Sequence, residues 1–323
     1  MPFIINQIEQ AVTALRAGNP VAIPTETVYG LAAMIDHQEA IKAVFTMKGR
    51  PLNHPLIVHI GADWPITDYV TALPDYAKQL IKAFWPGPLT LILPRNQIRI
   101  NSLVTGGQET VAIRCPAHPI AQKVLQQLQT PLVAPSANPF GKISPTTALH
   151  VKQSFPNQDL LILDGGRCSI GIESTIVDAT QANTYQILRH GTISEAALAK
   201  ATHTPLLEKE PSMRTPGNLD SHYQPQKPLY YFHHQKQLES FCQQKAGTVF
   251  VIASHKPASV NSLFFCPLEE QPEKAAYGLY YNLRQADASS AQCIAIELPP
   301  INKEWLGVRE RILKAGTAFQ EAP

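Results

Sequence analysis

No single-motif signature of a common enzyme class occurs in this 323-residue chain. It has neither a Walker A phosphate loop nor a GxGxxG dinucleotide turn, and it lacks the HExxH and GxSxG motifs of zinc peptidases and serine hydrolases. Any activity must therefore be inferred from several weaker motifs and from the order in which they follow one another.

Cysteine is scarce and shows no pairing pattern. The five cysteines are scattered and contain no CxxC pair, which argues against a disulfide framework and against a thiolate zinc site. The N-terminal stretch has no basic region followed by a long apolar core, and no apolar run approaches the length of a membrane span. We therefore expect a cytoplasmic protein without a membrane partner.

Charge of one sign is not in large excess either. The formal net charge is +2, with 16% charged and 44% hydrophobic residues, a composition typical of globular proteins. Such a charge gives no strong overall field for a polyanion, so composition does not favour nucleic-acid binding as the main activity. A local cationic pocket remains compatible with these numbers.

Short apolar runs alternate with amphipathic helical patterns throughout residues 1–200, which predicts an α/β domain. Capping boxes that start at Asn6 and Asp36 indicate the first two helices. Helices are predicted at 6–17, 36–49, 75–84 and 118–128, and strands at 21–23, 55–60, 89–93, 110–114, 131–134, 160–163, 174–178 and 185–188.

A proline-rich segment separates this domain from a second one. Residues 201–228 are interrupted by prolines and have almost no periodic apolar pattern, which is typical of a linker. In residues 229–323 the runs LYYF, TVFVIA, LFFC and CIAIEL indicate strands, most of them separated by helical patterns. The sequence therefore predicts a smaller C-terminal α/β domain with Rossmann-like alternation.

The stretch KGRPLNHPLIVHI, residues 48–60, places two cations around a glycine. Lys48 and Arg50 at a helix end would complement the helix dipole. The neighbouring Gly49 and Pro51 also fix the backbone, and two cations held near one point suit a phosphate chain. Both interpretations stand at this stage.

Two histidines lie in the same stretch. His54 and His59 are five residues apart, so on a strand they should face opposite sides. Neither has a metal-ligand partner at a familiar spacing, and we predict no metal site from them.

Arg114 interrupts an apolar strand at the point where it ends. A buried arginine needs a carboxylate partner. The partner comes either from the protein or from a ligand, and the sequence leaves these two alternatives at even odds.

Three further stretches place small or polar residues at predicted strand ends. PTETVYGL (24–31) lies where α/β folds form their ligand crevice, although it also fits a polar loop that caps backbone groups. LVAPSANPFGKIS (132–144) allows close backbone approach to a ligand, or is simply a turn. DGGRCSIGIESTIVDAT (164–180) offers Glu173 and Ser174 at a strand start, where such residues are often loop hydrogen-bonders.

Taken together and in this order, PTETVYGL, KGRPLNHPLIVH, the Thr110–Arg114 strand, APSAN and ESTIVD resemble the threonylcarbamoyl-AMP synthase family. The resemblance covers residues 1–200 nearly continuously and extends through TPGNLDSHYQP of the linker, as in the longer, two-domain form. It implies a YrdC-like fold, a twisted, partly open mixed sheet with helices and a positively charged concave surface. A small Rossmann-like C-terminal domain would follow it.

The resemblance also implies an activity. Members of the family are nucleotidyltransferases that make threonylcarbamoyl-AMP and diphosphate from L-threonine, bicarbonate and ATP. The implied cofactor is Mg²⁺ carried on ATP, without protein ligands assigned to it. The product would serve threonylcarbamoyladenosine formation next to the anticodon through a downstream tRNA threonylcarbamoyl transferase complex, so that tRNA is only an indirect partner.

Site residues are carried over by their positions in the motifs. The threonine side should contain Thr27, His59, Arg114, Ala134 and Ser174. The ATP side should contain Lys48, Arg50, His54, Thr110, Ser136, Ser144, Arg189 and Tyr223. Lys48 and Arg50 would act catalytically by offsetting charge as diphosphate leaves, and the linker 201–228 would form a lid, with Tyr223 over the nucleotide.

Some features depart from the family pattern or leave a role open. His54 stands where many relatives have asparagine, and RHG at 189–191 replaces the more usual RPG. Glu26 and Glu173 are candidate general bases, but neither is an obvious one.

Two other functions were weighed. An RNA-binding module with a cationic concave surface is the alternative, although the basic residues have no interleaved aromatics. A carbamoyltransferase of hydrogenase maturation would need a zinc-finger segment, which the cysteine spacing excludes.

Overall fold

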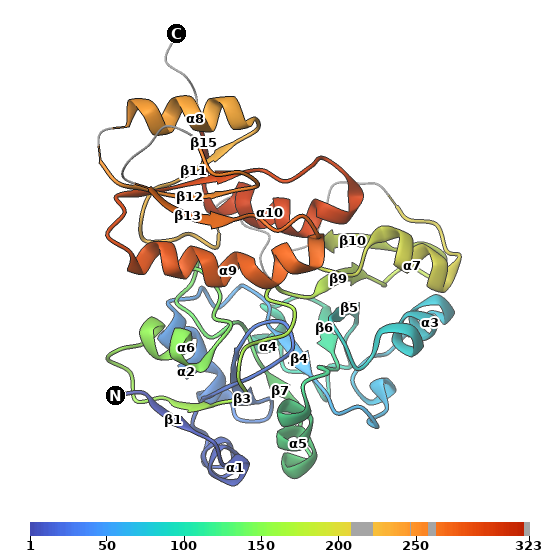
Figure 1. The fold of residues 1–323 in the computed structure, drawn as a ribbon. Helices are drawn as coiled ribbons and strands as arrows, with labels where there is room; N and C mark the ends of the chain where they lie inside the picture. The colour runs from blue at the N-terminus through green and yellow to red at the C-terminus, as the bar shows by residue number, and fades with distance from the viewer. Residues whose placement is uncertain (208–221, 246, 258–262, 320–323) are drawn as a thin grey trace.

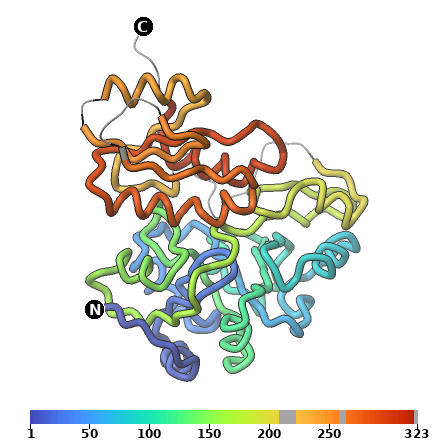
Figure 2. The backbone as a smooth tube through the Cα atoms, viewed as in Figure 1, coloured from blue at the N-terminus to red at the C-terminus, as the bar shows by residue number. Residues whose placement is uncertain are grey.

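Two stacked units, each built on its own sheet, make up the described chain (Figures 1 and 2). The computed structural model describes residues 1–207, 222–245, 247–257 and 263–319. We call residues 1–207 the N-terminal unit and the described residues from 222 onward the C-terminal unit. The fold is mixed α/β with a large mixed sheet and a second, parallel sheet, which confirms the predicted fold class.

The N-terminal unit is built on a sheet of strand order β1-β8-β2-β3-β7-β4-β6-β5-β9-β10. The strands are β1 (Phe3–Ile5), β2 (Val21–Ile23), β3 (Gly30–Met34), β4 (Ile57–His59), β5 (Leu89–Pro94), β6 (Thr110–Arg114), β7 (Leu132–Val133), β8 (Leu161–Leu163), β9 (Thr175–Asp178) and β10 (Gln186–Arg189). At its centre β4 runs parallel to β6, and β5 runs antiparallel to β6. Strands far apart in the sequence therefore lie side by side.

Helices cover both faces of this sheet. They are α1 (Ile8–Arg16), α2 (Gln38–Lys48), α3 (Asp75–Phe84), α4 (Ser102–Thr105), α5 (Pro119–Leu128), α6 (Ala148–Ser154) and α7 (Glu195–Thr202), with a 3₁₀ turn at Ile66–Asp68. The apolar sides of α1 and α5 share one core cluster with β2, β3, β7 and β8. Helices α2, α3, α6 and α7 contribute to the cluster on the opposite face.

The C-terminal unit is a parallel sheet of order β13-β12-β14-β11-β15. Its strands are β11 (Leu229–Phe232), β12 (Val249–Ala253), β13 (Leu263–Pro267), β14 (Cys293–Glu297) and β15 (Thr317–Ala318). Its helices are α8 (Gln235–Gln244), α9 (Pro272–Ala288) and α10 (Leu306–Ala315), with a 3₁₀ turn at Lys303–Trp305. Helices α9 and α10 lie on the side that faces the N-terminal unit, and α8 lies on the other (Figure 1).

The two units share one apolar core. The cluster under α9 and α10 contains Leu279 and Ile312 of the C-terminal unit together with Val28, Ile143 and Ile172 of the N-terminal unit. Because these side chains are 7% exposed or less, water is excluded along this contact. The contact therefore resembles a domain core more than a transient surface contact.

The structure corrects several local predictions. Helix α1 begins at Ile8 and α2 at Gln38, and the residue before each forms no side-chain cap, so the predicted caps at Asn6 and Asp36 are wrong. Strand β3 occupies a run that was not predicted as a strand, because its short apolar sequence GLAAM has no polar alternation. Both of its faces are buried, with Leu31 and Ala33 on one side and Ala32 and Met34 on the other.

All five cysteines are free thiols. Across the described ranges, no helix combines the length and the apolar character that a bilayer span requires.

Two helical glycines test the contact between the units. A Cβ at Gly307 in α10 would lie 2.5 Å from the carbonyl oxygen of Gly191 in the N-terminal unit, whereas a Cβ at Gly278 in α9 would meet only the end of the Asn282 side chain, at 3.3 Å. We expect Gly307→Ala to lower the free energy of unfolding by about 1–3 kcal/mol, because backbone atoms must shift. Gly278→Ala should raise it by about 0.5–1 kcal/mol through helix propensity.

Urea unfolding of both variants and the wild type measures this difference. A Gly307→Ala protein as stable as the wild type would show that α10 does not pack against the loop at Gly191 in solution.

Candidate functional site

A cavity of about 60 Å³ lies on the sheet of the N-terminal unit, beneath the C-terminal unit. Its wall is formed by the loop after β2, the end of α2, strands β4 and β6, the loop after β7, the segment before β9, and the end of β10. Predicted site residues that line it are Thr27, Lys48, Arg50, His59, Arg114, Ala134, Ser136, Ser174, Arg189 and Tyr223.

Three predicted site residues lie outside this lining. His54 lies before β4 and also before the predicted strand 55–60, so the expectation that it and His59 occupy opposite faces of one strand is wrong. Its ring packs edge-on against Phe140, with ring centroids 5.2 Å apart. Thr110 begins β6, opposite Pro94. Ser144 is fully buried and its hydroxyl donates to Glu173 at 2.6 Å.

Other lining residues were not predicted as site residues. Asn138, Phe140 and His222 line the cavity, although each lies in or next to a motif that was singled out. Glu173, considered only as a base, lines it as well. The available signal was that these residues lie within the quoted stretches LVAPSANPFGKIS, TPGNLDSHYQP and ESTIVD.

Sheet register brings His59 and Arg114 together. They are paired residues of the parallel strands β4 and β6, and Arg114 also pairs with Thr90 of β5. Paired residues of neighbouring strands project to the same face. The face that carries these side chains is therefore the floor of the cavity.

Arg114 has its carboxylate partner within the protein. Its guanidinium lies 2.5 Å from Oε1 of Glu26, donates to the Thr27 hydroxyl at 2.8 Å and to the Gly87 carbonyl at 3.3 Å. Burial raises the pKa of Glu26, but the adjacent Arg114 charge outweighs burial and the pKa ends below its usual value. Glu26 is thus a buried carboxylate anion whose Oε2 has no hydrogen-bond partner among the described residues.

His59 is a neutral imidazole at neutral pH. Burial, reinforced by the positive charge of Arg114, lowers its pKa to about 3. Its Nδ1 lies 3.2 Å from the Ile57 carbonyl oxygen, which favours a proton on Nδ1 and leaves Nε2 as an acceptor.

Three buried cations surround the same cavity. Lys48 is 3% exposed, Arg50 8% and Arg189 6%. Helix α2 ends in a left-handed Gly49 (φ 61°), a conformation that glycine adopts at low cost. The chain therefore reverses between Lys48 and Arg50, and both side chains reach the cavity.

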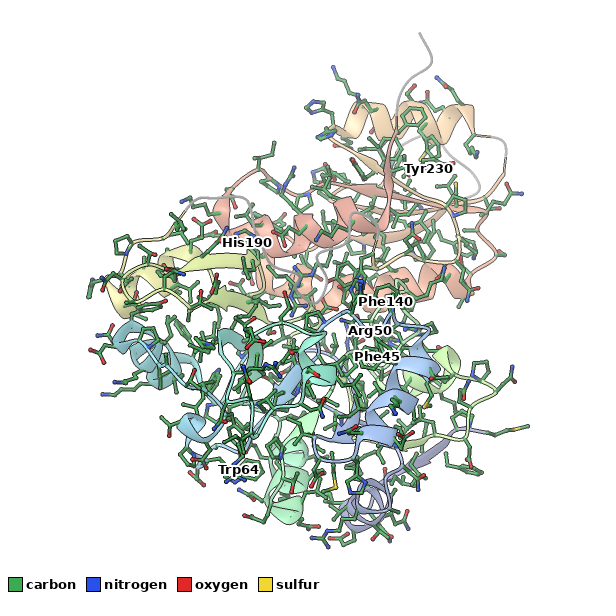
Figure 3. The ribbon with its side chains drawn as sticks, turned by 180° about the vertical axis from the view of Figure 1, so that it is seen from behind. Phe45, Arg50, Trp64, Phe140, His190 and Tyr230 are labelled. Carbon is green, nitrogen blue, oxygen red and sulfur yellow. The ribbon has the colours of Figure 1, made fainter. Side chains whose placement is uncertain are left out.

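Backbone carbonyls hold two of these cations. The Lys48 ammonium donates to the carbonyls of Ser136 and Asn138 at 2.5 and 2.6 Å, and Arg50 donates to the Pro55 carbonyl at 2.8 Å. Arg50 also lies over the Phe140 ring, 5.4 Å from its centroid (Figure 3). Burial holds the pKa of Lys48 well below its usual range, and repulsion from Arg50 adds to this effect.

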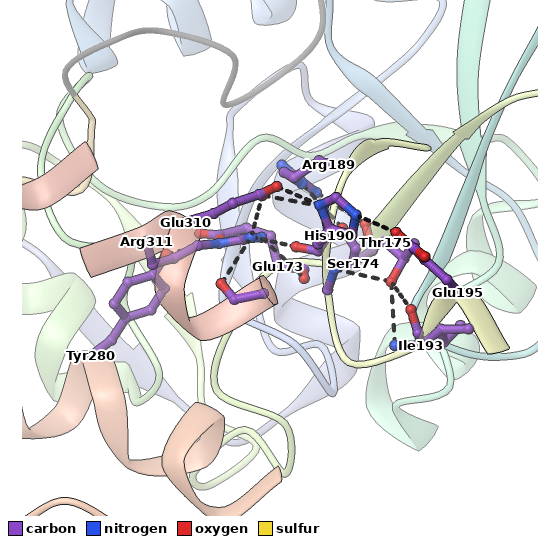
Figure 4. A network of polar contacts seen from close by, with 12 residues as sticks. Glu173, Ser174, Thr175, Arg189, His190, Ile193, Glu195, Tyr280, Glu310 and Arg311 are labelled. Atoms are coloured by element: carbon purple, nitrogen blue, oxygen red, sulfur yellow. Dashed lines mark hydrogen bonds and ion pairs between the residues drawn. The ribbon is translucent and has the colours of Figure 1, made fainter. Parts of the chain in front are cut away.

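Glu173 is a wall residue of the N-terminal unit that side chains of both units hold in place. The Glu173 carboxylate accepts hydrogen bonds from the Ser144 hydroxyl at 2.6 Å, the Tyr280 hydroxyl at 2.8 Å and Arg311 Nε at 3.1 Å (Figure 4). Burial raises its pKa, but the charges of Arg311 and Arg189 and the bond from Ser144 outweigh burial and bring the pKa to about 2. Glu173 is therefore ionised at any physiological pH.

Two linker residues line the cavity. His222 and Tyr223 are 7% and 1% exposed, and their rings meet edge-on with centroids 4.0 Å apart. Neither His222 Nδ1 nor the Tyr223 hydroxyl has a hydrogen-bond partner among the described residues. Residues 208–221 of the predicted lid 201–228 lie outside the described residues.

Within the described ranges, no cluster of three or more histidine, cysteine or carboxylate side chains is arranged to hold a metal ion.

Comparison with protein-family models assigns both units. Residues 13–191 match the Sua5/YciO/YrdC model, whose description is telomere recombination. Residues 180–317 match a model described as the C-terminal domain of threonylcarbamoyl-AMP synthase.

Curated relatives and solved structures agree with these models. Threonylcarbamoyl-AMP synthase of Bacillus subtilis is 37% identical over 321 residues, which cover 96% of this chain and 92% of the relative. That of Pyrococcus abyssi is 46% identical over 175 residues, 54% of this chain and 51% of the relative. The crystal structure of P. abyssi Sua5 complexed with L-threonine superposes with a TM-score of 0.87 at 32% identity, over 98% of this chain and 97% of that one.

A histidine cluster beside the cavity also joins the two units. His190 Nδ1 bonds Oε1 of Glu310 in α10, and its Nε2 lies 3.5 Å from Oε1 of Glu195 in α7. Lys303 completes the cluster, with its ammonium 2.7 Å from Glu195. Burial lowers the pKa of His190, but the bonds and charges of Glu310 and Glu195 outweigh burial and raise the pKa above its usual value.

This cluster predicts a pH-dependent contribution to stability. A raised folded-state pKa means that the contact stabilises the fold fully below the unfolded-state pKa of about 6.5, and that the contribution is lost as pH rises through the folded-state pKa. We expect His190→Gln to cost about 1 kcal/mol at pH 6, a modest value because the side chain is partly exposed, and less at pH 9.

Urea unfolding of the wild type and His190→Gln across this pH range measures the effect, with His255→Gln as a control for an exposed histidine. A difference that stays constant or grows with pH contradicts the prediction.

Proposed function

This chain belongs to the threonylcarbamoyl-AMP synthase family, and we propose that it makes threonylcarbamoyl-AMP and diphosphate from L-threonine, bicarbonate and ATP. The observation that carries the proposal is one cavity lined by two chemically different sets of side chains. Lys48, Arg50 and Arg189 provide positive charge on one side. His59 and Arg114 of the β4–β6 floor, with Thr27 of the loop after β2, provide hydrogen-bonding groups on the other.

The threonine side of the proposal uses Arg114, Thr27, His59, Ser174 and the backbone at Ala134. Arg114 would hold the carboxylate of threonine while it shares its guanidinium with Glu26, which lies 2.5 Å away. A Thr27 or Ser174 hydroxyl would pair with the threonine hydroxyl. Discrimination against serine rests on the one methyl group that serine lacks, which is worth about 1–3 kcal/mol of binding free energy. Valine is rejected more strongly, because it would leave the buried hydrogen-bond partner of the threonine hydroxyl unpaired.

The ATP side of the proposal uses the three cations and Ser136, with Tyr223 above the nucleotide. Arg50 and Arg189 can form forked hydrogen bonds with phosphate oxygens, and Lys48 adds a point charge. Magnesium would enter as the counter-ion of the triphosphate. Glu173 lines the cavity, yet its oxygens already accept bonds from Ser144, Tyr280 and Arg311, so the described lining fits no protein-held magnesium.

The proposed reaction needs no general base from the protein. The neutral amine of threonine adds to bicarbonate, which forms the N–C bond of a carbamate and releases water. A carbamate oxygen then attacks the α-phosphorus of ATP and breaks the bond to the departing diphosphate, whose charge Lys48 and Arg50 offset. Carbamates decompose in water, which gives a reason for an enclosed site.

The carboxylates of the site fit this scheme. Glu26 is ion-paired and Glu173 has a pKa of about 2, so neither has the pKa near 7 that an efficient general base requires. Alignment of the reactants then supplies the main catalytic effect, of about 7–11 kcal/mol in well-oriented systems.

Burial of the cations disfavours the RNA-binding alternative. A nucleic-acid backbone is bound by exposed lysines and arginines, whereas Lys48, Arg50 and Arg189 are all less than 9% exposed. A small anion inside the cavity makes better use of them than a polymer on the surface.

The proposal is tested by following diphosphate release from ATP–Mg²⁺. We expect release to require both threonine and bicarbonate, and threonylcarbamoyl-AMP to accumulate in equal amount, as measured by mass spectrometry. Diphosphate release that is independent of threonine contradicts the assignment.

A second experiment separates the two sides of the site. Arg50→Lys should raise KM for ATP and Arg114→Lys should raise KM for threonine, each about tenfold or more, because lysine loses the forked geometry. Lysine is chosen since an alanine at position 114 would leave Glu26 buried without a countercharge. Arg16→Lys, which changes an arginine of α1 that bonds the Gln127 carbonyl, is the control.

Steady-state kinetics with each substrate varied in turn gives both constants. Equal shifts of both KM values in both variants rule out the division of roles.

A further inference from the structure

Glu173 is the one acidic side chain among the described residues that line the cavity. It is 7% exposed and ionised, with a pKa of about 2. The negative charge of Glu173 repels a bound polyanion unless a nearby cation offsets it. The side chain that supplies this cation therefore affects how well the cavity binds an anionic ligand.

That cation comes from the C-terminal unit. Arg311 of α10 is 1% exposed and its Nε lies 3.1 Å from Glu173 Oε2. The same guanidinium bonds the His190 carbonyl and lies 5.6 Å from the centroid of the Tyr223 ring. Tyr280 of α9 donates to the same Glu173 oxygen at 2.8 Å. Figure 4 shows Arg311 and Tyr280 of the C-terminal unit beside Glu173 of the N-terminal unit.

We infer that Arg311 is a positioning residue of the proposed synthase site: it takes up the charge of Glu173 and so keeps Lys48, Arg50 and Arg189 available to the phosphates of ATP. The inference rests on the proposed function for the identity of the ligand. The C-terminal unit thereby completes the electrostatics of a cavity that lies in the N-terminal unit.

The electrostatic surroundings support this role. The negative charge of Glu173 acts on both Lys48 and Arg189. Without Arg311, the buried carboxylate would have these two cations as its nearest sources of positive charge, and it would repel phosphate oxygens besides. Binding of any phosphate chain should weaken as a result.

The same helix offers a matched control. Arg309 is also buried, at 9% exposure, and its guanidinium bonds the Pro299 carbonyl of its own unit. Substitution of Arg309 removes a buried arginine of α10 without touching Glu173. It therefore separates loss of packing from loss of the charge match.

The experiment titrates the full-length chain with ATP and, separately, with inorganic pyrophosphate, by calorimetry. The proteins are the wild type, Arg311→Met, Arg309→Met, Glu173→Gln and the double variant Glu173→Gln/Arg311→Met. Arg311→Met should raise Kd for both anions about tenfold or more. Arg309→Met should stay within about threefold of the wild type. The double variant should return to within about threefold of Glu173→Gln, because no buried carboxylate remains to be matched.

Each other result overturns a defined part of this account. A loss in Arg311→Met that persists in the double variant shows that Arg311 acts through packing and overturns the inference. A wild type that binds pyrophosphate but not ATP overturns the proposed function. In that case the Kd values of the variants for pyrophosphate still test the role of Arg311. A wild type that binds neither anion overturns both. If Arg311→Met does not fold, a double variant that binds more than threefold weaker than Glu173→Gln overturns the inference.

Discussion

The buried ion pair between Glu173 and Arg311 is the contact on which the arrangement of the two units depends. Taking two charges out of water is costly, and the cost is offset only with good geometry and additional hydrogen bonds. Ser144, Tyr280 and the His190 carbonyl provide those bonds. The apolar core around α9 and α10 excludes water from the pair. The orientation of the C-terminal unit and the wall of the cavity are therefore set by the same residues.

The charged side chains around the cavity are held by two kinds of partner, charged and neutral. Each carboxylate near it is matched by an arginine, Glu26 by Arg114 and Glu173 by Arg311. Lys48, by contrast, is oriented by the neutral carbonyls of Ser136 and Asn138. A neutral acceptor fixes the direction of a cation without cancelling its charge. The cavity thus keeps a positive potential that suits a phosphate chain, although the whole chain is nearly neutral.

Much of the fold could be predicted from local patterns. Strands at 21–23, 89–93 and 110–114 and the helix at 118–128 were predicted within a residue or two, because their apolar periodicity agrees with their burial. Predictions failed where local signals were weak or misleading. The run Gly30–Met34 is apolar on both faces and was missed as a strand. Asn6 and Asp36 have the spacing of a capping box, but neither residue caps its helix.

The sequence by itself determined which motifs matter, because glycine, proline and charged residues at fixed spacing impose local backbone shapes. It showed the cations at Lys48 and Arg50, and it left open which carboxylate Arg114 would meet. Only the tertiary structure decided that this partner is Glu26 and that Arg311 pairs with Glu173 in the wall of the cavity. These contacts join residues 88 and 138 positions apart. They follow from sheet register and from the packing of α10, which no local pattern encodes.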